Sequence, residues 1–398
     1  MENAPRRQNW PERNPKKVIF LIVLLAIGCI AVVSEKILAL KNHNRVNPAG
    51  IQRYIKLREF NPLYRDVLVP NADAIRMSDG LAQKPFVLRV DRQGFIMPSK
   101  IHDHPDLTIA FLGGSTTECV YVDEKLRFPF LAGRLLEQQT GLKVNSYNAG
   151  RSGNNTLHCI NVLMNKVVNL KPDIVVLMEN INDLAILMYD KTYWNNNPSR
   201  SPIIEKKQNF KTVGKDLEQT FHLVRDLTFP NLSWAIRGIL HARGKAHGDE
   251  FKADRGKKIT IDQDLLVREF GLNLQTFINI CRARGITPVL MTQASRFTDH
   301  PDPPVRKMMH RLEVRQGIPY GEFKGAFDRL NDTIREVGAK DGVLVIDLAQ
   351  EIPPVKENIC DVAHFNDHGS RLVAEKIAAQ LKPVIPSLIK KPLANQEK

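Results

Sequence analysis

The sequence predicts a doubly wound α/β fold built on a parallel sheet of about five strands. Two observations lead to this prediction. From Leu107 onward, short apolar segments alternate with longer amphipathic segments, as strands alternate with helices in a parallel sheet. In addition, Pro172–Met178 (P-D-I-V-V-L-M) carries apolar residues on both faces, which is typical of a strand covered by helices on both sides.

The alternation predicts the elements in order. The expected strands are Leu107–Leu112, Leu142–Tyr147, Pro172–Met178, Thr287–Met291 and Val343–Leu348. The expected helices are Glu124–Thr140, Asn155–Leu170, Asp262–Arg284, Tyr320–Val337 and His368–Leu381. Gly141 and Gly285 follow two of these helices, where glycine commonly ends a helix. Ligands of such sheets bind outside the carboxyl ends of the strands, so we expect a functional site there.

An apolar run near the N-terminus predicts a membrane segment. Val18–Val33 is uninterrupted by polar residues and would span about 24 Å as a helix, short of a hydrocarbon core of about 30 Å. Snorkelling by Lys17 and Lys36, or extension through Leu40, would close this gap. We therefore expect a transmembrane signal anchor at residues 18–40. A cleaved signal peptide is the alternative, because Val32-Val33-Ser34 is an acceptable cleavage site.

The flanking charges predict the topology. The basic residues before the run slightly outnumber those in the twenty residues after it; they are Arg6, Arg7, Arg13, Lys16 and Lys17 against Lys36, Lys41, Arg45 and Arg53. Positive charge favours the cytoplasmic side, so residues 1–17 are expected to be a cytoplasmic tail. The protein would cross the inner (plasma) membrane once, with its large domain outside the cytoplasm.

The remaining organisation follows from composition. Residues 41–106 are rich in Pro, Asn and Arg and predict a membrane-proximal stalk with short strands. The α/β domain is expected at residues 107–388, with a polar, basic insertion at about 191–261, and residues 389–398 form a C-terminal tail. The insertion is either a lid, a substrate platform or partner surface, or a solvated decoration.

The net charge of +14 raises the question of nucleic-acid binding. The chain shows no zinc-ligand spacing, no heptads and no aromatic RNA-binding signature, so no nucleic-acid partner is expected. A basic surface facing anionic lipid or an acidic polymer fits the composition instead. The five cysteines are widely spaced, and no pattern assigns disulfide pairs.

The stretch F-L-G-G-S-T-T-E-C, residues 111–119, allows two interpretations. Ser115 is a helix N-cap if Glu118, three residues later, completes a capping box. Alternatively, the turn through two glycines presents the Ser115 hydroxyl as a nucleophile at the carboxyl end of a strand. The second interpretation requires a base, a group that orients the base, and donors for an oxyanion.

Those groups follow the other strands. In N-I-C-D-V-A-H-F-N-D-H-G, Asp361 and His364 lie three residues apart after the fifth strand. Glycine- and asparagine-rich turns end the second and third strands, at Asn148–Asn155 (N-A-G-R-S-G-N-N) and Glu179–Asp183 (E-N-I-N-D). His368 would suggest a metal, but no further ligand cluster accompanies it, so no metal site is expected. The capping box explains one of these four turns, whereas catalysis explains all of them.

The four blocks together resemble the signature blocks of SGNH (GDSL-type) hydrolases. G-G-S-T-T-E, N-A-G-R-S-G-N, N-I-N-D and D-V-A-H-F-N-D-H-G stand in the order and spacing of that family, and the resemblance covers about Leu107 to Ile385. It implies a flavodoxin-like three-layer α/β/α sandwich. It also implies an acyl-transfer reaction without a metal or organic cofactor.

The resemblance further implies a role for each matching residue. Ser115 matches the nucleophile and also an oxyanion N–H donor. Gly153 and Asn182 match the other oxyanion donors. His364 matches the base and Asp361 its partner, which completes a Ser-His-Asp triad.

The motif blocks differ from the family pattern at two positions. Gly114 stands where the GDS motif has aspartate, and Asn180 stands where the third block has glycine. Neither change removes a reacting group. Within the second block, Gly150 is a further candidate for the oxyanion glycine, although it matches less well than Gly153.

The expected function is that of a serine esterase or acyltransferase. A membrane-anchored domain outside the cytoplasm resembles SGNH proteins that add or remove acetyl groups on envelope carbohydrate, often beside a membrane acyltransferase. We therefore expect an ester-bearing substrate, with O-acyl groups of cell-envelope carbohydrate as the leading class. The alternatives are a lipid-directed esterase or lysophospholipase, and a non-catalytic, membrane-tethered glycan-binding scaffold.

Overall fold

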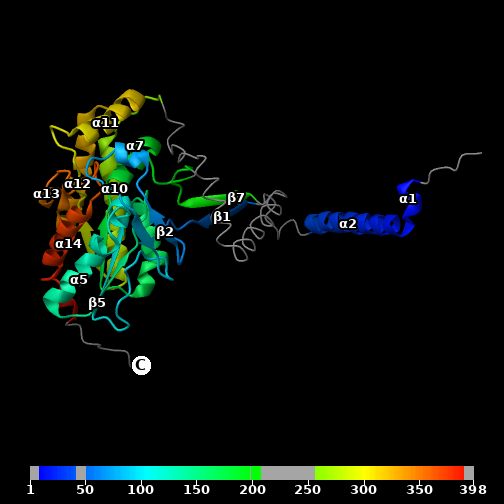
Figure 1. Cartoon of the computed structure of the whole chain (residues 1–398), viewed down its shortest axis with the longest axis horizontal. Coiled ribbons are helices and arrows are strands. Elements are labelled where there is room, and N and C mark those ends of the chain that lie inside the picture. The colour runs from blue at the N-terminus through cyan, green and yellow to red at the C-terminus, as the bar shows by residue number, and fades with distance from the viewer. Residues whose placement is uncertain (1–8, 42–50, 198, 208–255, 390–398) are drawn as a thin grey trace, which may run out of the picture. The chain divides into compact units, whose positions relative to one another are not determined.

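The structure is a computed structural model, and it describes residues 9–41, 51–197, 199–207 and 256–389. These residues fall into two units. The first contains residues 9–41, 51–54 and 204–207, and the second contains residues 55–203 and 256–389. Figure 1 shows the chain with its elements labelled. Much of the expected insertion, residues 208–255, lies outside the described residues, as do the ends of both expected tails.

The first unit contains a long apolar helix. After the short α1 (Trp10–Arg13), α2 runs from Pro15 to Lys41 and is therefore about 40 Å long. Its segment Pro15–Ser34 has a mean hydropathy of 2.8, and among the described residues this is the one helix long and apolar enough to cross a membrane. Its side chains from Ile19 to Ser34 are exposed. A helix that is apolar all round is suited to lipid, either as a membrane anchor or as a signal peptide.

The centre of the second unit is a parallel sheet of five strands. They are β4 (Leu107–Gly113), β5 (Val144–Asn148), β6 (Ile174–Met178), β8 (Thr287–Met291) and β9 (Leu344–Ile346). Their order is β5-β4-β6-β8-β9, with every neighbouring pair parallel. In chain order this is 2-1-3-4-5, the flavodoxin-like arrangement. The predicted fold class is therefore confirmed.

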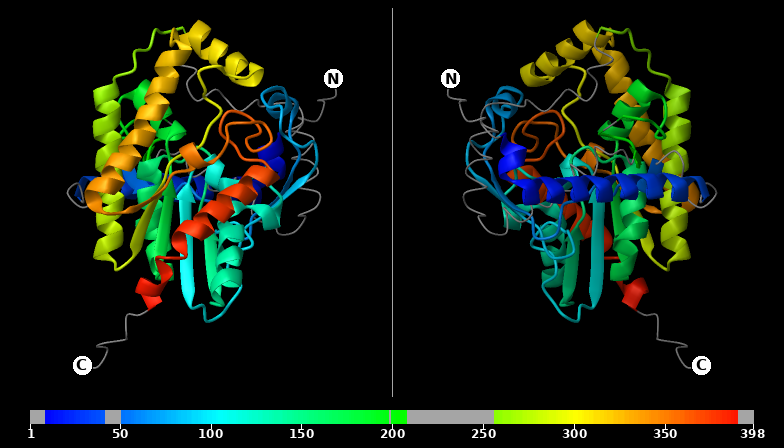
Figure 2. Two further views of the ribbon diagram at one scale, coloured as in Figure 1. Left: turned by 90° about the vertical axis from the view of Figure 1, so that its left-hand side faces the viewer. Right: turned by 90° about the vertical axis from the view of Figure 1, so that its right-hand side faces the viewer.

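Helices cover both faces of the sheet, and Figure 2 shows them around the strands. One face packs against α6 (Thr156–Asn165), α7 (Ile181–Asp190), α10 (Gln263–Ala283) and α12 (Tyr320–Asp341), and the other against α5 (Phe128–Thr140) and α14 (Asp367–Leu381). Neighbouring residues of β4 alternate between the two cores: Ala110 and Leu112 face one, Ile109 and Phe111 the other. Burial on both faces explains the continuous apolar strands in the sequence.

Two predicted helices are interrupted. The predicted helix Glu124–Thr140 is a 3₁₀ turn (Glu124–Leu126) followed by α5, with Arg127 between them. The Arg127 side chain is 1% exposed and donates hydrogen bonds to backbone carbonyls of three other segments. The predicted helix Asn155–Leu170 likewise ends at Asn165 and is followed by a 3₁₀ turn, Val167–Leu170. Both predictions followed the apolar period, which continues through these breaks.

The short strands expected within residues 41–106 correspond to β1 (Ile51–Ile55), β2 (Arg65–Leu68) and β3 (Phe86–Arg89). The elements that were not predicted are α3 (Ala72–Arg76), α4 (Ser115–Glu118), α7, β7 (Ile203–Lys207), α11 (Pro303–Gln316), α13 (Leu348–Glu351) and α15 (Ile385–Ile389). β1 pairs with β7, and β2 pairs with β3. Most are too short for hydrophobic periodicity to reveal them.

Residues 55–106 pack in the same unit as the sheet rather than apart from it as a stalk. Phe60, Leu88, Val90 and Ile96 form a small buried cluster. The Ile96 N–H donates to the carbonyl of Asn148 at the end of β5, with 3.0 Å between nitrogen and oxygen. The segment is therefore polar in composition but buries a small group of apolar side chains. Through Ile96 it also reaches the carboxyl edge of the sheet. Residues 42–50 lie outside the described residues.

The four cysteines of the second unit, Cys119, Cys159, Cys281 and Cys360, are buried and free of disulfides. Each behaves as a small side chain of the core, and burial raises the pKa of each thiol.

Candidate active site

A pocket of about 950 Å³ lies at the carboxyl edge of the sheet. The strand order reverses between β4 and β6, which is the place where ligands bind in open α/β sheets. Ser115 follows β4 and Asn182 follows β6, and both line the pocket together with Gly153, Asp361 and His364. The structure therefore brings all the residues of the predicted triad and oxyanion hole into one cavity.

Two glycines bring the Ser115 turn close to its neighbours. A Cβ atom on Gly113 would lie 2.7 Å from the carbonyl oxygen of Met178, the last residue of β6. A Cβ atom on Gly114 would lie 2.3 Å from Asn182 Nδ2. Real Cβ atoms do not approach other atoms so closely, so a side chain at position 113 would meet the backbone of β6, and one at position 114 would displace the Asn182 amide. The chain leaves β4 through these glycines because the turn packs directly against the end of β6.

The capping-box interpretation of Ser115 does not describe this turn. The N-cap of α4 is Gly114, and Ser115 is the first helical residue. The Ser115 hydroxyl instead lies 2.7 Å from Nε2 of His364. The Glu118 carboxylate pairs with Arg151 at 3.0 Å and accepts a hydrogen bond from the backbone N–H of Ser152 at 2.7 Å. A capping box does occur in the chain, at the start of α6.

His364 is held between Ser115 and Asp361. Its Nδ1 lies 2.7 Å from Asp361 Oδ2, so Nδ1–H donates to the carboxylate and Nε2 is left to accept from the Ser115 hydroxyl. Asp361 Oδ1 accepts the backbone N–H groups of Ala363 and His364, at 2.9 and 2.8 Å. These bonds fix the carboxylate and the imidazole ring in one geometry.

The environment sets the protonation of this pair. Burial disfavours the charged imidazole, but the charge of Asp361 and its hydrogen bond to the ring outweigh burial, so the pKa of His364 lies above its ordinary value of 6.5. Burial also opposes ionisation of Asp361. The neighbouring His364 and the two backbone N–H donors outweigh it and hold the pKa of Asp361 below its ordinary value of 3.8. The carboxylate is therefore charged at neutral pH, and it orients and supports a basic histidine.

Arg296 holds the loop that carries Asp361 and His364. Its guanidinium is 1% exposed and donates to the carbonyl oxygens of Ile359 and Asp361, at 3.3 and 3.4 Å. The same group forms a two-nitrogen ion pair with Asp79. The loop is therefore fastened to the segment around Asp79, which contributes Met77 and Leu81 to the pocket.

The second motif block contains two glycines with different positions. Gly153 lines the pocket and has φ of +77°, a left-handed conformation that favours glycine. Gly150 is buried beneath α4, where an added Cβ atom would lie 2.5 Å from the backbone nitrogen of Glu118. Gly150 thus serves the packing of the turn, and Gly153 is the one of these two glycines that lines the pocket together with Ser115.

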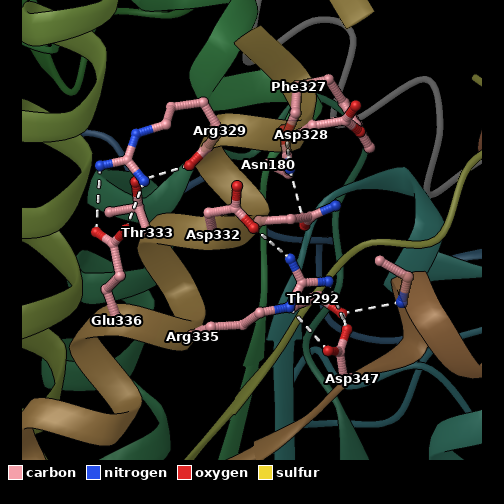
Figure 3. A network of polar contacts seen from close by, with 12 residues as sticks. Asn180, Thr292, Phe327, Asp328, Arg329, Asp332, Thr333, Arg335, Glu336 and Asp347 are labelled. Carbon is pink, nitrogen blue, oxygen red and sulfur yellow. Dashed lines mark hydrogen bonds and ion pairs between the residues drawn. The ribbon is translucent and has the colours of Figure 1, made fainter. Parts of the chain in front are cut away.

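The contacts of the Asn180 side chain account for asparagine in place of the motif glycine in the third block. Its φ of −168° is extended backbone, which any residue adopts, so glycine is not required there. Its side-chain amide donates to the carbonyl oxygen of Phe327 and to Oδ1 of Asn331, both at 2.9 Å. Figure 3 shows Asn180 beneath α12, beside the ion pairs and hydrogen bonds that link this helix to Asp347 and Thr292. Asn180 therefore fastens the turn that carries Asn182 to α12.

Asp183, the last residue of the third block, joins that turn to the second block. Its carboxyl accepts the Thr156 N–H at 3.0 Å and the Thr156 hydroxyl at 2.6 Å, and also the Tyr193 hydroxyl at 2.5 Å. Burial raises the pKa of Asp183 to about 6, although these hydrogen bonds favour the ionised form. The N-I-N-D sequence thus holds the start of α6 and the start of α7 together.

Sequence reasoning missed several residues around the pocket. Ala74, Met77 and Leu81 come from the segment expected to be a stalk, and Ser199 and Arg200 come from the start of the expected insertion. Neither segment carries a motif, so a single sequence offers no signal for them. Their placement depends on long-range contacts such as the Arg296–Asp79 pair.

The GDSL-like Lipase/Acylhydrolase family matches residues 111–372. Among solved structures, the acetyl xylan esterase AlAXEase is similar at 16% identity, covering 69% of this chain and 98% of its own, with a TM-score of 0.39. A lipase/acylhydrolase from Enterococcus faecalis gives 18% identity, 70% and 96% coverage and a TM-score of 0.37.

An acetylxylan esterase from Geobacillus stearothermophilus, Axe2, gives 14% identity, 73% and 97% coverage and a TM-score of 0.39. At these identities and TM-scores, none of the three structures indicates a substrate for this chain. No curated protein matches the sequence. The family match covers more than half of the chain, so the chain belongs to the GDSL-like lipase/acylhydrolase family, the SGNH hydrolases, and is a hydrolase that acts on ester bonds.

Proposed function

We propose that this protein is a serine esterase in which Ser115 is the nucleophile, His364 the general base and Asp361 the group that orients the base. The observation that carries the proposal is the continuous chain of hydrogen bonds from Asp361 through His364 to Ser115, at 2.7 Å each. Both distances lie within the reach required for nucleophilic catalysis. A non-catalytic scaffold would have no need of this alignment.

The reaction proceeds in two steps. His364 Nε2 takes the proton of the Ser115 hydroxyl while Oγ attacks the ester carbonyl, which forms a tetrahedral oxyanion. The N–H groups of Ser115 and Gly153 and the side-chain amide of Asn182 stabilise that oxyanion. The alcohol leaves with the proton from His364. Water, activated by the same histidine, then attacks the acyl-enzyme and restores Ser115; attack by a sugar hydroxyl would give transfer instead.

We place the substrate among O-acylated carbohydrates of the cell envelope. The lining of the pocket combines small and apolar residues, Ala74, Met77, Leu81 and Val120, with polar residues, Arg151, Ser152, Asn197, Ser199 and Arg200. The apolar side chains suit an acyl group, and the polar side chains suit a hydroxyl-rich alcohol. The volume of about 950 Å³ is at the upper end for ligand pockets and exceeds the needs of an acetyl group alone.

The proposed location is the outer side of the inner (plasma) membrane, with α2 as a single-pass anchor and the N-terminus in the cytoplasm. The length and hydropathy of α2 and the slight excess of basic residues before it support this topology. An enzyme held there would meet envelope polymers rather than cytoplasmic esters.

The first experiment is fluorophosphonate labelling of the full chain in detergent, with Ser115→Ala as the matched control. We expect labelling of the wild type and none of the variant. The second experiment compares acetate release from acetylated polysaccharide with hydrolysis of a lysophospholipid. Faster hydrolysis of the lysophospholipid would move the assignment to the lipid-directed class, and a folded wild type that does not label would contradict the serine mechanism.

A further inference from the structure

Two arginines lie behind the proposed oxyanion hole, and neither belongs to a motif block. Arg58 is in the segment expected to be a stalk, and Arg200 is in the expected insertion. Arg58 Nη2 donates to the carbonyl oxygen of Ser152 at 3.0 Å. Arg200 Nη1 donates to the carbonyl oxygen of Gly153 at 2.8 Å and to Oδ1 of Asn182 at 3.4 Å.

Two of these three oxygen atoms, the Ser152 carbonyl and Asn182 Oδ1, belong to the donor groups themselves, and the Gly153 carbonyl belongs to the next peptide group. The Ser152 carbonyl and the Gly153 N–H are the two ends of one peptide group. Likewise, Asn182 Oδ1 and Nδ2 are the two ends of one side-chain amide. Each guanidinium therefore bonds the oxygen end of an amide whose N–H end is assigned to the oxyanion. We propose that Arg58 and Arg200 are positioning residues that fix and polarise the two oxyanion donors, Gly153 and Asn182.

This inference rests on the proposed function, because it assumes that these donors face a developing oxyanion. Its physical basis is twofold. A hydrogen bond at the oxygen end fixes the plane of the amide, so the N–H direction is set before substrate binds. A cation at that oxygen also draws electron density from the amide, which strengthens the N–H as a donor through hydrogen-bond cooperativity.

The position of Arg200 is itself held by the motif blocks. Its side chain is 8% exposed, and its carbonyl oxygen lies 2.9 Å from Nε2 of His158 on α6. His158 Nδ1 accepts the backbone N–H of Asn155 at 3.2 Å, so Nε2 carries the proton and donates to Arg200. Burial and the nearby charge of Arg58 lower the pKa of His158 to about 3, which keeps this ring neutral and the tautomer fixed.

The two arginine segments also support one another. Arg58 Nη1 donates to the carbonyl oxygen of Ser199, the residue before Arg200. Arg58 Nε lies 3.3 Å from Oδ1 of Asn154, whose amide in turn donates to the Arg58 carbonyl oxygen at 3.2 Å. The loop that contains Gly153 is thus held between residue 58 on one side and residue 200 on the other.

The second N–H of the Asn182 amide has a separate partner. Glu179 is 3% exposed and hydrogen-bonds the Asn182 side chain. With Oδ1 bound by Arg200 and one N–H directed to Glu179, the amide has one N–H left for the oxyanion. The rotamer of Asn182 is therefore determined by hydrogen bonds at both atoms of its amide, Oδ1 and Nδ2.

A double-mutant cycle on the full chain in detergent tests the proposal, with kcat and KM measured on 4-nitrophenyl acetate. Arg200→Met should lower kcat about tenfold, less than the loss of a whole donor, with KM changed by less than about threefold. In an Asn182→Ala background the same change should lower kcat by no more than about threefold, because the amide it acts on is gone.

Arg58→Met is the matched comparison within the same cycle. It acts on the Gly153 peptide, so its effect on kcat should be the same with and without Asn182→Ala. Arg200→Lys, which keeps the cation, should retain more activity than Arg200→Met. Thermal unfolding and the final extent of fluorophosphonate labelling verify that each variant is folded.

The outcomes separate this inference from the function on which it rests. Equal losses for Arg200→Met in both backgrounds, or a rise in KM with kcat unchanged, would overturn the positioning role; the rise in KM would assign Arg200 to substrate binding. In either case an active wild type that labels leaves the esterase assignment intact. A folded wild type that neither labels nor hydrolyses esters would overturn both.

Discussion

Gly114 and Asn182 occupy adjoining space: a Cβ atom at position 114 would lie 2.3 Å from Asn182 Nδ2 and 3.4 Å from Glu179 Oε2. The family motif has aspartate at this position. In this chain the space beside Gly114 is filled instead by the Asn182 amide of α7 and by the carboxyl of Glu179, which follows β6. Burial and the nearby Asp183 raise the pKa of Glu179 well above its ordinary value. The replacement of the motif aspartate by Gly114 therefore leaves the room that the Asn182 and Glu179 side chains occupy.

This relationship predicts that restoring the motif aspartate is harmful. Gly114→Asp should lower kcat/KM at least tenfold, because the new side chain displaces the Asn182 amide from the position that it needs as a donor. Steady-state hydrolysis of 4-nitrophenyl acetate measures the effect. Gly321→Ala is the control, since nothing lies within 4 Å of its added Cβ on α12, and it should leave activity unchanged. A Gly114→Asp variant as active as the wild type would show that this space is not restricted.

Asn182→Ala should lower kcat by about 10² to 10³, the usual effect of losing one oxyanion donor. The variant removes the amide that lies between Arg200 and Glu179, while Ser115, His364 and Asp361 keep their contacts. Fluorophosphonate labelling should therefore persist, although at a reduced rate. Turnover equal to that of the wild type would remove Asn182 from the catalytic site.

The pH dependence follows from the pKa of His364. The base must be neutral to accept the Ser115 proton, and its pKa is raised, so the acidic limb of kcat/KM should have a midpoint above pH 6.5. Asp361→Asn removes the charge that raises this pKa and leaves the burial that lowers it. The midpoint should then move to lower pH, while kcat falls by about 10⁴ through loss of the correct tautomer.

A pH profile of both proteins measures this prediction. Asp361→Glu is the comparison that keeps the negative charge. The midpoint of its acidic limb should therefore stay closer to that of the wild type than to that of Asp361→Asn. An Asp361→Asn profile with an unmoved or raised midpoint would mean that another group raises the pKa of His364.

Much of the fold could be predicted from the sequence, and the reason lies in the strands. Segments such as Ile174–Met178 are buried on both faces, so a run of apolar residues marks each one. The loops after the strands carry the reacting groups, and Ser115, His364 and Asp361 could be named because a motif places them at fixed spacing. The helix breaks before Arg127 and before Lys166 could not be predicted, because these two side chains donate hydrogen bonds to carbonyl oxygens of segments distant in the sequence.

The supporting residues of the site were equally beyond the sequence. Arg58, Arg200 and Arg296 act through backbone carbonyls, and almost any loop offers carbonyl oxygens to an arginine. No pattern of side chains distinguishes these three from the other basic residues of a strongly basic chain. Only the topology, which brings residues 58, 200 and 296 to the carboxyl edge of one sheet, reveals their roles.

Asn180→Gly, which restores the motif glycine of the third block, should destabilise the protein. The change leaves the Phe327 carbonyl and Asn331 Oδ1 without the donor that reaches them at 2.9 Å. Loss of a buried hydrogen-bond partner costs roughly 1 to 3 kcal/mol in the free energy of unfolding. Urea unfolding of the full chain in detergent measures the loss. An unchanged midpoint would show that α12 holds the turn without this amide.

The ion pair between Asp79 and Arg296 predicts that the stability of the protein depends on the charge of Asp79. Its hydrogen bonds to Arg296 hold the pKa of Asp79 below its ordinary value of 3.8, so this group stabilises the fold above that pH and loses its contribution as pH falls through the lowered pKa. Asp79→Asn should lower the free energy of unfolding by roughly 1 to 3 kcal/mol at pH 7, because the buried guanidinium then keeps Asp302 as its one ionic partner among the described residues. The difference in the free energy of unfolding between the wild type and Asp79→Asn should become smaller as the pH falls through the lowered pKa of Asp79.

The same substitution should raise KM more than it lowers kcat. Asp79 connects the segment that contains Met77 and Leu81 to the loop that carries His364, so its loss loosens the pocket wall while the Ser115–His364 contact remains. Chemical denaturation at pH 7 and in a series of more acidic buffers down to about pH 2, below the lowered pKa of Asp79, together with steady-state kinetics at neutral pH, measures both effects. Lys324→Met, which removes an ion pair with Asp328 away from the pocket, is the control and should leave KM unchanged. A stability difference that is constant with pH, or a loss confined to kcat, would contradict the proposed link between the ion pair and the wall of the pocket.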